Sequence, residues 1–392
     1  MRSKILFILI VWSIEPVFAE DEFESRSLDL SYETSCDTRN DLITLSFVGD
    51  ILIHQALYRS VVAGSQHFSQ IWKKTDGLIN KADISVGNLE GPAALGVDRQ
   101  GRDRGDIGFV YDGEVYSGTN FLFNYHPRIL SDLKKSGYDL LTVANNHVLD
   151  RYSLGIDKTI LAARQLNLPV VGARHSQERN APFYQIVQTQ NMKIAFIGCT
   201  EMTNGNPDTK DQVLFCYKNP KRILAMIKEI SSRPEVDALV VLPHWGREYT
   251  STPEDQQKAF AKQYLEAGAS LVMGSHPHVL QPWQKYVTRD GRETLIGYSL
   301  GNFVAGQYGL ARKAGVVAYV GLSKEGSQKA KIFGVGYTPT YREGNEVFPI
   351  GGRDSRSVLN HVAALFGSKR RIEPTGALLE ALCAKVSGVE NQ

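Results

Sequence analysis

Residues 272–281, VMGSHPHVLQ, place two histidines directly after an apolar run. The run is typical of the end of a buried strand, and small residues then lead to His276 and His278 on either side of Pro277. Because proline fixes its own φ and disfavours a helical residue before it, the pattern predicts an extended segment. Side chains two residues apart on such a segment point the same way. Neutral imidazole is a preferred ligand of divalent metals, so the stretch is a candidate metal site, although chance loop histidines would also explain it in isolation.

The same pattern, an apolar strand that ends in polar side chains, occurs at four other places. These stretches are ITLSFVGD (43–50), DISVGNLEG (83–91), YDLLTVANNHVLD (138–150) and DALVVLPHWGREY (237–249). Segments with helical apolar spacing separate them, which predicts an α/β fold with a largely parallel sheet. In such folds ligands bind beyond the carboxyl ends of the strands, so we expect the five strand ends to form one site.

The side chains at these strand ends form a mixed set of carboxylates, amides and imidazoles without thiolates. Four of the nine histidines are among them. A single structural zinc site usually takes four ligands, often cysteines, whereas a set of this size suits two divalent ions that share a bridging carboxylate. Such a pair activates water and neutralises charge on a phosphoryl oxygen, which favours a phosphoester hydrolase. The candidates are Asp50, Asn88 or Glu90, Asn146, His147, His244, His276 and His278, with His54 following Asp50 by four residues.

Six motifs between Leu45 and Phe303 resemble, in order, the bacterial poly-γ-glutamate capsule biosynthesis family (CapA/PgsA type). They are GDILIH, GNLEGP, ANNHVLD, HWGREY, GSHPHVLQ and SLGNF. That family is similar to the calcineurin-like metallophosphoesterases. The resemblance therefore implies an α/β sandwich of two mixed β-sheets flanked by helices, and two divalent ions (Mn, Fe or Zn) as cofactors.

The resemblance also implies a role for each matching residue. Asp50, Asn146, His244, His276 and His278 would be metal ligands, Glu90 would be the bridging carboxylate with Asn88 as the alternative, and His147 would be the general acid. Two positions depart from the metallophosphoesterase pattern. His54 stands four residues after Asp50 instead of two, and Glu90 is one methylene longer than the usual aspartate.

Several polar residues beside these motifs have both a functional and a structural interpretation. Glu248 would either accept a hydrogen bond from the ring nitrogen of a ligand histidine that does not bind metal, or form a surface ion pair. Asp150 precedes a helical pattern and is more typical of an N-cap than of a catalytic group. Asn302 in LGNF would contact substrate or shape a turn.

A glycine- and arginine-rich loop, LGVDRQGRDRGD (95–106), lies between two of the ligand-bearing strands. Arginine binds phosphate and carboxylate oxygens in bidentate fashion. The loop is therefore predicted to line the path of an anionic substrate through Arg99, Arg102 and Arg104; a surface insertion is the alternative.

The N-terminus, MRSKILFILIVWSIEPVFAE, is typical of a signal peptide. Two basic residues precede an apolar run too short to span a bilayer, and small residues precede a cleavage site after Ala19. We therefore expect a periplasmic or secreted protein without a membrane span. The expected parts are a signal peptide (1–19), a flexible lead-in (20–40), the CapA-like domain (41–321) and a C-terminal extension of strands and helices (322–392).

Export makes the four cysteines candidates for disulfides, and four cysteines allow three pairings. The short separation of Cys199 and Cys216 motivates the hypothesis that these two are bonded. Closing that loop would stabilise the fold by about 3 kcal/mol.

The composition is that of a globular protein, and the formal charge of +2 over 392 residues gives no reason to expect nucleic acid as a partner. The expected function is an exported dinuclear phosphomonoesterase or phosphodiesterase that acts on a phosphoester or anionic polymer in capsule or cell-envelope biosynthesis. The alternative is a scaffold without catalysis that binds the anionic polymer, its synthase or its export proteins.

Overall fold

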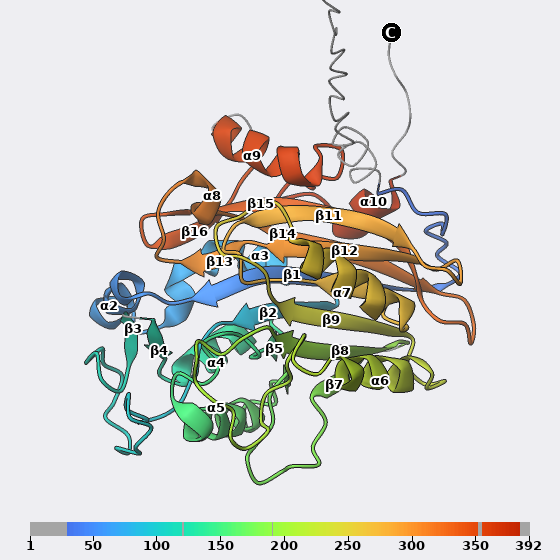
Figure 1. Ribbon diagram of the computed structural model, residues 1–392. Helices are drawn as coiled ribbons and strands as arrows, with labels where there is room; N and C mark the ends of the chain where they lie inside the picture. Colours follow the sequence, from blue (N-terminus) through green and yellow to red (C-terminus); the bar gives the residue numbers. More distant parts are fainter. Residues whose placement is uncertain (1–29, 120, 190, 352–354, 385–392) are drawn as a thin grey trace, which may run out of the picture.

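In the computed structural model, two mixed β-sheets pack face to face between layers of helices (Figure 1). The structure describes residues 30–384 except 120, 190 and 352–354. The predicted signal peptide lies outside these residues. The architecture confirms the expected sandwich of two mixed sheets flanked by helices.

The first sheet has parallel strands at its centre and antiparallel strands on one side. β1 pairs in parallel with β2 and antiparallel with β14, and β2 continues in parallel to β5 and β6. The strands of this sheet are β1 (Asp41–Leu52), β2 (Ile84–Leu89), β5 (Leu140–Thr142), β6 (Val170–Val171), β13 (Asn302–Ala305), β14 (Ala314–Lys324), β15 (Lys331–Glu343) and β16 (Glu346–Pro349).

The second sheet repeats this plan. β8, β9, β10 and β12 run parallel, and β7 and β11 are antiparallel edges. Its strands are β7 (Tyr184–Gln188), β8 (Lys193–Thr200), β9 (Ala238–His244), β10 (Leu271–Met273), β11 (Leu280–Val287) and β12 (Glu293–Leu300). A separate hairpin joins β3 (Ser117–Thr119) and β4 (Leu122–Asn124).

Helices cover the outer faces of the sheets, except that the helix Arg356–Phe366 packs Val358, Val362 and Phe366 into the apolar cluster between the sheets. They are α2 (Gln55–Ala63), α3 (Asp76–Ile79), α4 (Arg128–Lys135), α5 (Tyr152–Gln165), α6 (Pro220–Ser231), α7 (Asp255–Glu266), α8 (Leu310–Lys313), α9 (Arg356–Phe366) and α10 (Leu378–Cys383), with 3₁₀ turns at Phe68–Ile71 and Lys73–Thr75. Short turns, instead of one continuous helix, thus occupy residues 68–79. Within the described residues, none of the helices has the length and apolar character needed to cross a bilayer.

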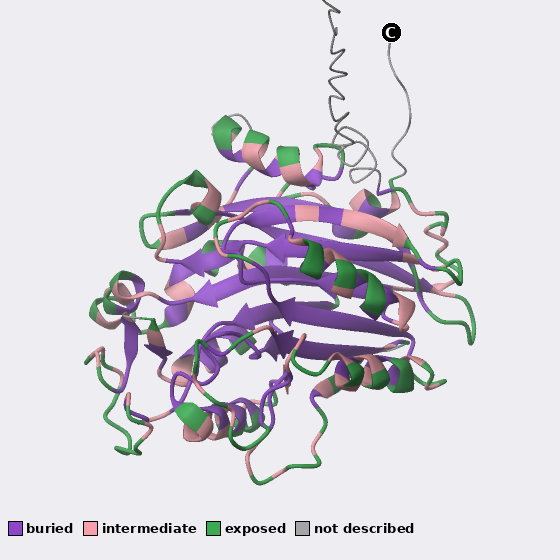
Figure 2. Cartoon of the chain, in the orientation of Figure 1, coloured by how far each residue is buried: buried purple, intermediate pink, exposed green. Residues whose placement is uncertain are grey.

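The core is layered because alternate strand residues face opposite sides. Phe47 and Val86 of the first sheet share an apolar cluster between the sheets with Phe196 and Val240 of the second. A second cluster lies under α2, α4 and α5, and a third lies under α6 and α7. Figure 2 shows the result: the strands are almost wholly buried, and the helices expose only their outer faces. Burial on both faces explains why the central strands are continuous apolar runs.

The C-terminal part is integral to the first sheet. The predicted boundary after residue 321 falls inside β14, which pairs with β1 along most of its length. β15 and β16 then extend the same sheet. The strands of the expected extension therefore belong to the main domain.

The predicted flexible lead-in differs from the structure in its second half. Leu30 is buried in the cluster between the sheets, and Lys285 donates a hydrogen bond to the Ser31 carbonyl at 2.7 Å. A disulfide then joins Cys36 to Cys383 of α10. The predicted Cys199–Cys216 disulfide is confirmed, and it links the end of β8 to the loop that follows.

Candidate metal centre

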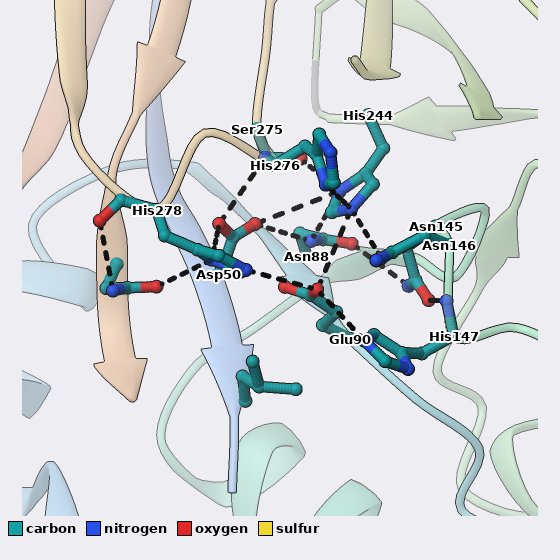
Figure 3. Close-up of polar contacts among 12 residues, drawn as sticks. Asp50, Asn88, Glu90, Asn145, Asn146, His147, His244, Ser275, His276 and His278 are labelled. Atoms are coloured by element: carbon teal, nitrogen blue, oxygen red, sulfur yellow. Dashed lines mark hydrogen bonds and ion pairs between the residues drawn. The ribbon is translucent and has the colours of Figure 1, made fainter. Parts of the chain in front are cut away.

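The predicted strand ends meet in one buried cluster where the two sheets come together (Figure 3). Asp50 of β1 is in parallel register with Asn88 of β2. Asn146 and His147 follow β5, which completes the contribution of the first sheet. The second sheet supplies His244 as the last residue of β9, and His276 and His278 after β10. All of these side chains are buried.

Glu90, directly after β2, is the centre of the cluster. Its Oε1 lies 3.7 Å from Nε2 of His244, 3.8 Å from Nε2 of His278 and 3.9 Å from Nε2 of His147. Both carboxylate oxygens are fully buried and have no hydrogen-bond partner among the described residues. Leaving a buried polar group unpaired is costly, so a carboxylate facing several imidazoles in this state fits a metal ion.

Two groups of side chains could each hold an ion, and Glu90 belongs to both. One is Glu90 with His244 and His276, and the other is Glu90 with Asp50 and His278; in each, the ligand atoms lie within 4.8 Å of one another. Asn146 adds an oxygen to the first group, since its Oδ1 lies 2.9 Å from Nε2 of His244. The donor set is compatible with a divalent metal site.

The backbone conformation at His276 and His278 differs from the predicted extended segment, although both side chains reach the site. His276 and His278 have φ angles of 101° and 58°, so the segment turns through the left-handed region instead of running extended. Such conformations are unfavourable for residues with a side chain and persist where the surrounding structure fixes them. The two rings consequently diverge, each serving one of the two groups.

His147 stands at the edge of the cluster with its two ring nitrogens in different surroundings. Nδ1 lies 2.8 Å from Oδ2 of Asp150, and Nε2 faces Glu90. The ring also packs edge-on against Phe123. Asp150 is therefore a partner of His147, and the predicted helix cap is wrong: the residue before α5 is Arg151, whose side chain makes no capping hydrogen bond.

Amides and a hydroxyl orient the candidate ligands. Asn88 donates to Oδ1 of Asp50 at 2.8 Å and also lies 3.2 Å from Nδ1 of His244. Asn145 donates to the Leu89 carbonyl, and the hydroxyl of Ser275 lies 3.0 Å from Nδ1 of His244. Asn88 thus supports the ligands in this structure. Sequence reasoning gave no role to Ser275, whose position directly before His276 was the available signal.

Three other predicted residues lie close to the cluster. His54 accepts a hydrogen bond from the Gly306 N–H through Nδ1 and belongs to neither group. Asn302 is buried; its Oδ1 lies 3.0 Å from Nδ1 of His278, so the geometry favours support of His278. Glu248 is half-buried, and its charge acts on Glu90 and His278.

The arginine loop is fixed by one buried carboxylate. Arg102 and Arg104 both form ion pairs with Asp98, at 2.9 and 2.7 Å, and remain about half exposed. Nε of Arg99 is buried without a hydrogen-bond partner among the described residues. A role of these arginines in substrate binding stays a prediction.

Electrostatics keep two of the imidazoles neutral. Burial, reinforced by the neighbouring histidines, lowers the pKa of His244 well below its usual value and that of His276 to about 4. Burial also opposes the charged form of His278, but Glu90 and Asp50 outweigh it and raise the pKa to about 9. Burial raises the pKa of Glu90. Burial thus favours the protonated form of Glu90, whereas a bound cation would favour the ionised carboxylate.

Comparison with known proteins places the chain in a family. Residues 44–307 match the family model described as bacterial capsule synthesis protein PGA_cap. The chain is 28% identical over 294 residues to PGA biosynthesis protein CapA of Bacillus subtilis strain 168, which covers 75% of this chain and 71% of that protein. It is 29% identical over 272 residues to capsule biosynthesis protein CapA of Bacillus anthracis. That match covers 68% of this chain and 61% of the Bacillus anthracis protein.

Similar solved structures are more distant. NAD nucleotidase of Haemophilus influenzae gives a TM-score of 0.46 at 13% identity over 85% of this chain and 64% of that one. A phosphatase of Mycoplasma pneumoniae gives a TM-score of 0.43 at 12% identity. That match covers 78% of this chain and 95% of the phosphatase chain. The match to the family model extends over more than half of the sequence and includes the whole candidate metal centre, and the chain belongs to the bacterial capsule synthesis protein PGA_cap family.

Proposed function

We propose that this protein is an exported, metal-dependent phosphoester hydrolase that acts in the biosynthesis of a capsule or another cell-envelope polymer. The observation that carries the proposal is Glu90, whose buried and unpartnered carboxylate faces three imidazole nitrogens and belongs to both groups of candidate ligands. Family membership and the names of the two Bacillus relatives support the capsule context.

Two divalent ions, when bound, would supply a polarised water nucleophile and neutralise charge on the phosphoryl oxygens. Asp50 and His278 would hold one ion, His244, His276 and Asn146 the other, and Glu90 both. His147 would donate the Nε2 proton of its imidazolium form to the leaving oxygen, while Asp150 accepts the Nδ1–H and stabilises the positive charge. Burial of the cluster strengthens each of these electrostatic interactions.

One observation favours a scaffold without catalysis as the second candidate. His54, the sole histidine near Asp50 in the first motif, is engaged by the Gly306 N–H instead of joining the Asp50 group. That group therefore offers a single imidazole. A site that holds one ion would lack the metal pair that activates water, yet it would still bind an anionic polymer or a synthase.

The test combines metal analysis with hydrolysis of nitrophenyl phosphate and bis(nitrophenyl) phosphate under each divalent ion. Glu90→Gln keeps the shape of the side chain and removes its charge, so both metal content and hydrolysis are expected to fall. Glu266→Gln, the same change at a carboxylate that binds the Tyr286 hydroxyl, is the control. If the wild type hydrolyses neither ester with any ion, the scaffold is the correct function.

A further inference from the structure

On the Asp50–His278 side of the centre, Tyr249 and Arg312 lead from the buried cluster to the surface. The Tyr249 ring lies 6.0 Å from the His278 ring, tilted by 34°. The Arg312 guanidinium lies over the Tyr249 ring, 4.4 Å from its centroid. Tyr249 is 44% exposed and Arg312 is exposed. A molecule bound at His278 would meet this pair on its way out.

Arg312 is also tied to the centre through the backbone. The side-chain nitrogen of Asn302 donates to the Arg312 carbonyl at 2.9 Å and to the His278 carbonyl at 3.1 Å. The same nitrogen contacts Oε1 of Gln307 at 3.0 Å, and Nε2 of Gln307 donates to the Tyr249 hydroxyl at 3.3 Å. One buried amide therefore fixes His278, Tyr249 and Arg312 relative to one another.

The charge of Arg312 is available for a ligand. Arg102 and Arg104 are, by contrast, ion-paired with Asp98. No ion pair or hydrogen bond engages the Arg312 guanidinium within the part of the chain that the structure describes, where it lies over the face of Tyr249. An unpaired guanidinium held on an aromatic ring presents its planar fork of donors to solvent, which suits a carboxylate or a phosphate.

We infer that Arg312 and Tyr249 form a subsite for a second anionic group, a carboxylate or a phosphate, on the part of the substrate that is not transferred. The inference rests on the proposed function for the position of the reacting phosphoester. Tyr249 packs against the linking part of the substrate, and Arg312 binds the second anion in bidentate fashion. The preferred substrates are therefore phosphoesters of molecules that carry another negative charge.

Kinetics on matched substrates test the subsite. 3-Phosphoglycerate and glycerol 3-phosphate differ by one carboxylate, and glycerol 1,3-bisphosphate replaces that carboxylate by a phosphate. Arg312→Gln is expected to raise KM for the doubly anionic substrates by about 10–100-fold, with little effect on KM for glycerol 3-phosphate and on kcat, since hydrogen bonds to charged groups contribute on that scale. The doubly anionic substrate whose KM rises more shows whether the subsite prefers a carboxylate or a phosphate.

Arg128→Gln is the control, because Arg128 also lies 4.4 Å from an aromatic centroid, that of Phe109, but donates to the Gln66 carbonyl and contacts no candidate ligand. Arg312→Lys keeps the positive charge but loses the bidentate donors of the guanidinium. It should therefore restore part of the preference for doubly anionic substrates over glycerol 3-phosphate. The inference would be overturned if Arg312→Gln changed KM equally for all three substrates. It would also be overturned if Arg128→Gln raised KM for the doubly anionic substrates by the same factor.

A binding experiment separates this inference from the proposed hydrolysis. Penta-γ-glutamate is titrated calorimetrically into metal-loaded and metal-free wild-type protein, Arg312→Gln and Arg128→Gln. Weaker binding by about tenfold or more in Arg312→Gln alone supports the subsite even if no phosphoester is hydrolysed. No discrimination between the matched substrates, together with binding that is absent or unchanged by Arg312→Gln, shows that the subsite does not exist.

Discussion

Nδ1 of His147 lies 2.8 Å from Oδ2 of Asp150, and the same carboxylate oxygen accepts the Phe123 N–H at 2.7 Å. The contact assigns the Nδ1 proton to the Asp150 side of the ring and leaves Nε2 directed at the cluster. Asp150 is therefore a positioning residue that acts through His147.

Asp150→Asn should separate orientation from metal binding. The amide can no longer accept the Nδ1 proton in the same way, so kcat should fall by about 10–100-fold, the range for groups that orient a functional imidazole. Metal content, measured by mass spectrometry, should stay near the wild-type value because Asp150 belongs to neither ligand group. Asp157→Asn, at a carboxylate that binds Ser176, is the control. Loss of metal in Asp150→Asn would contradict the assignment.

A pair of histidine variants tests which imidazoles hold metal. His278→Ala removes a candidate ligand, so metal content should fall, and thermal stability with it, because a bound ion stabilises the native state. His147→Ala should retain metal and lower the rate by about 10²–10⁴-fold, the usual contribution of a general acid. The loss should shrink for a nitrophenyl ester, whose leaving group needs no proton. If His147→Ala loses as much metal as His278→Ala, then His147 is a ligand.

The convergence of the strand ends could be predicted because parallel strands carry their carboxyl ends to the same edge of a sheet. Asp50, Glu90 and His244 illustrate this, since each stands within two residues of the carboxyl end of a central strand. The apolar runs before them also identified the buried strands correctly. What these runs could not show was that the strands divide between two sheets whose edges meet at the site.

The finer geometry depends on contacts between residues far apart in the sequence. The left-handed turns at His276 and His278 oppose the extended conformation that Pro277 favours, and packing of the surrounding loop overrides that local preference. His54 is near Asp50 in sequence, but the N–H of Gly306 occupies its Nδ1. Neither contact leaves a signal in a short motif.

The Cys199–Cys216 disulfide should contribute measurably to stability. Its sequence separation is 17 residues, and a loop of that size gives about 3 kcal/mol of stabilisation through restriction of the unfolded chain. The double variant Cys199→Ser with Cys216→Ser should therefore unfold at a lower urea concentration, followed by circular dichroism. Reducing agent should lower the wild-type midpoint further than this double substitution does, because it also opens the Cys36–Cys383 bond. An unchanged midpoint would mean that the loop is restrained without the bond.

Asp98 should make the arginine loop sensitive to acid. Burial opposes ionisation of this carboxyl, but hydrogen bonds from the Arg102 N–H and from the Arg104 and Arg102 side chains hold its pKa below the usual range. A lowered folded-state pKa gives stability that is present above the unfolded value of about 3.9 and is lost as pH falls through the folded value.

Asp98→Asn should accordingly destabilise the loop at pH 7, and its difference from wild type should narrow as pH falls below about 4. Hydrogen exchange of residues 96–105 measures this directly. Asp106→Asn removes an exposed carboxylate that accepts the Gly108 N–H and serves as the control. A difference that is the same at pH 7 and pH 3 would contradict the role of the charge.

The bond between Cys36 and Cys383 turns nearly the whole described chain into a closed covalent ring. Once the contacts of Leu30 and Ser31 are released, tension applied before Cys36 and after Cys383 would run through the two sulfur atoms and bypass the strands within the ring. A polymer or partner pulling on the chain ends would thus leave the metal centre unloaded. A single protease cut within the ring would likewise leave both pieces attached, and the two fragments would separate only after reduction.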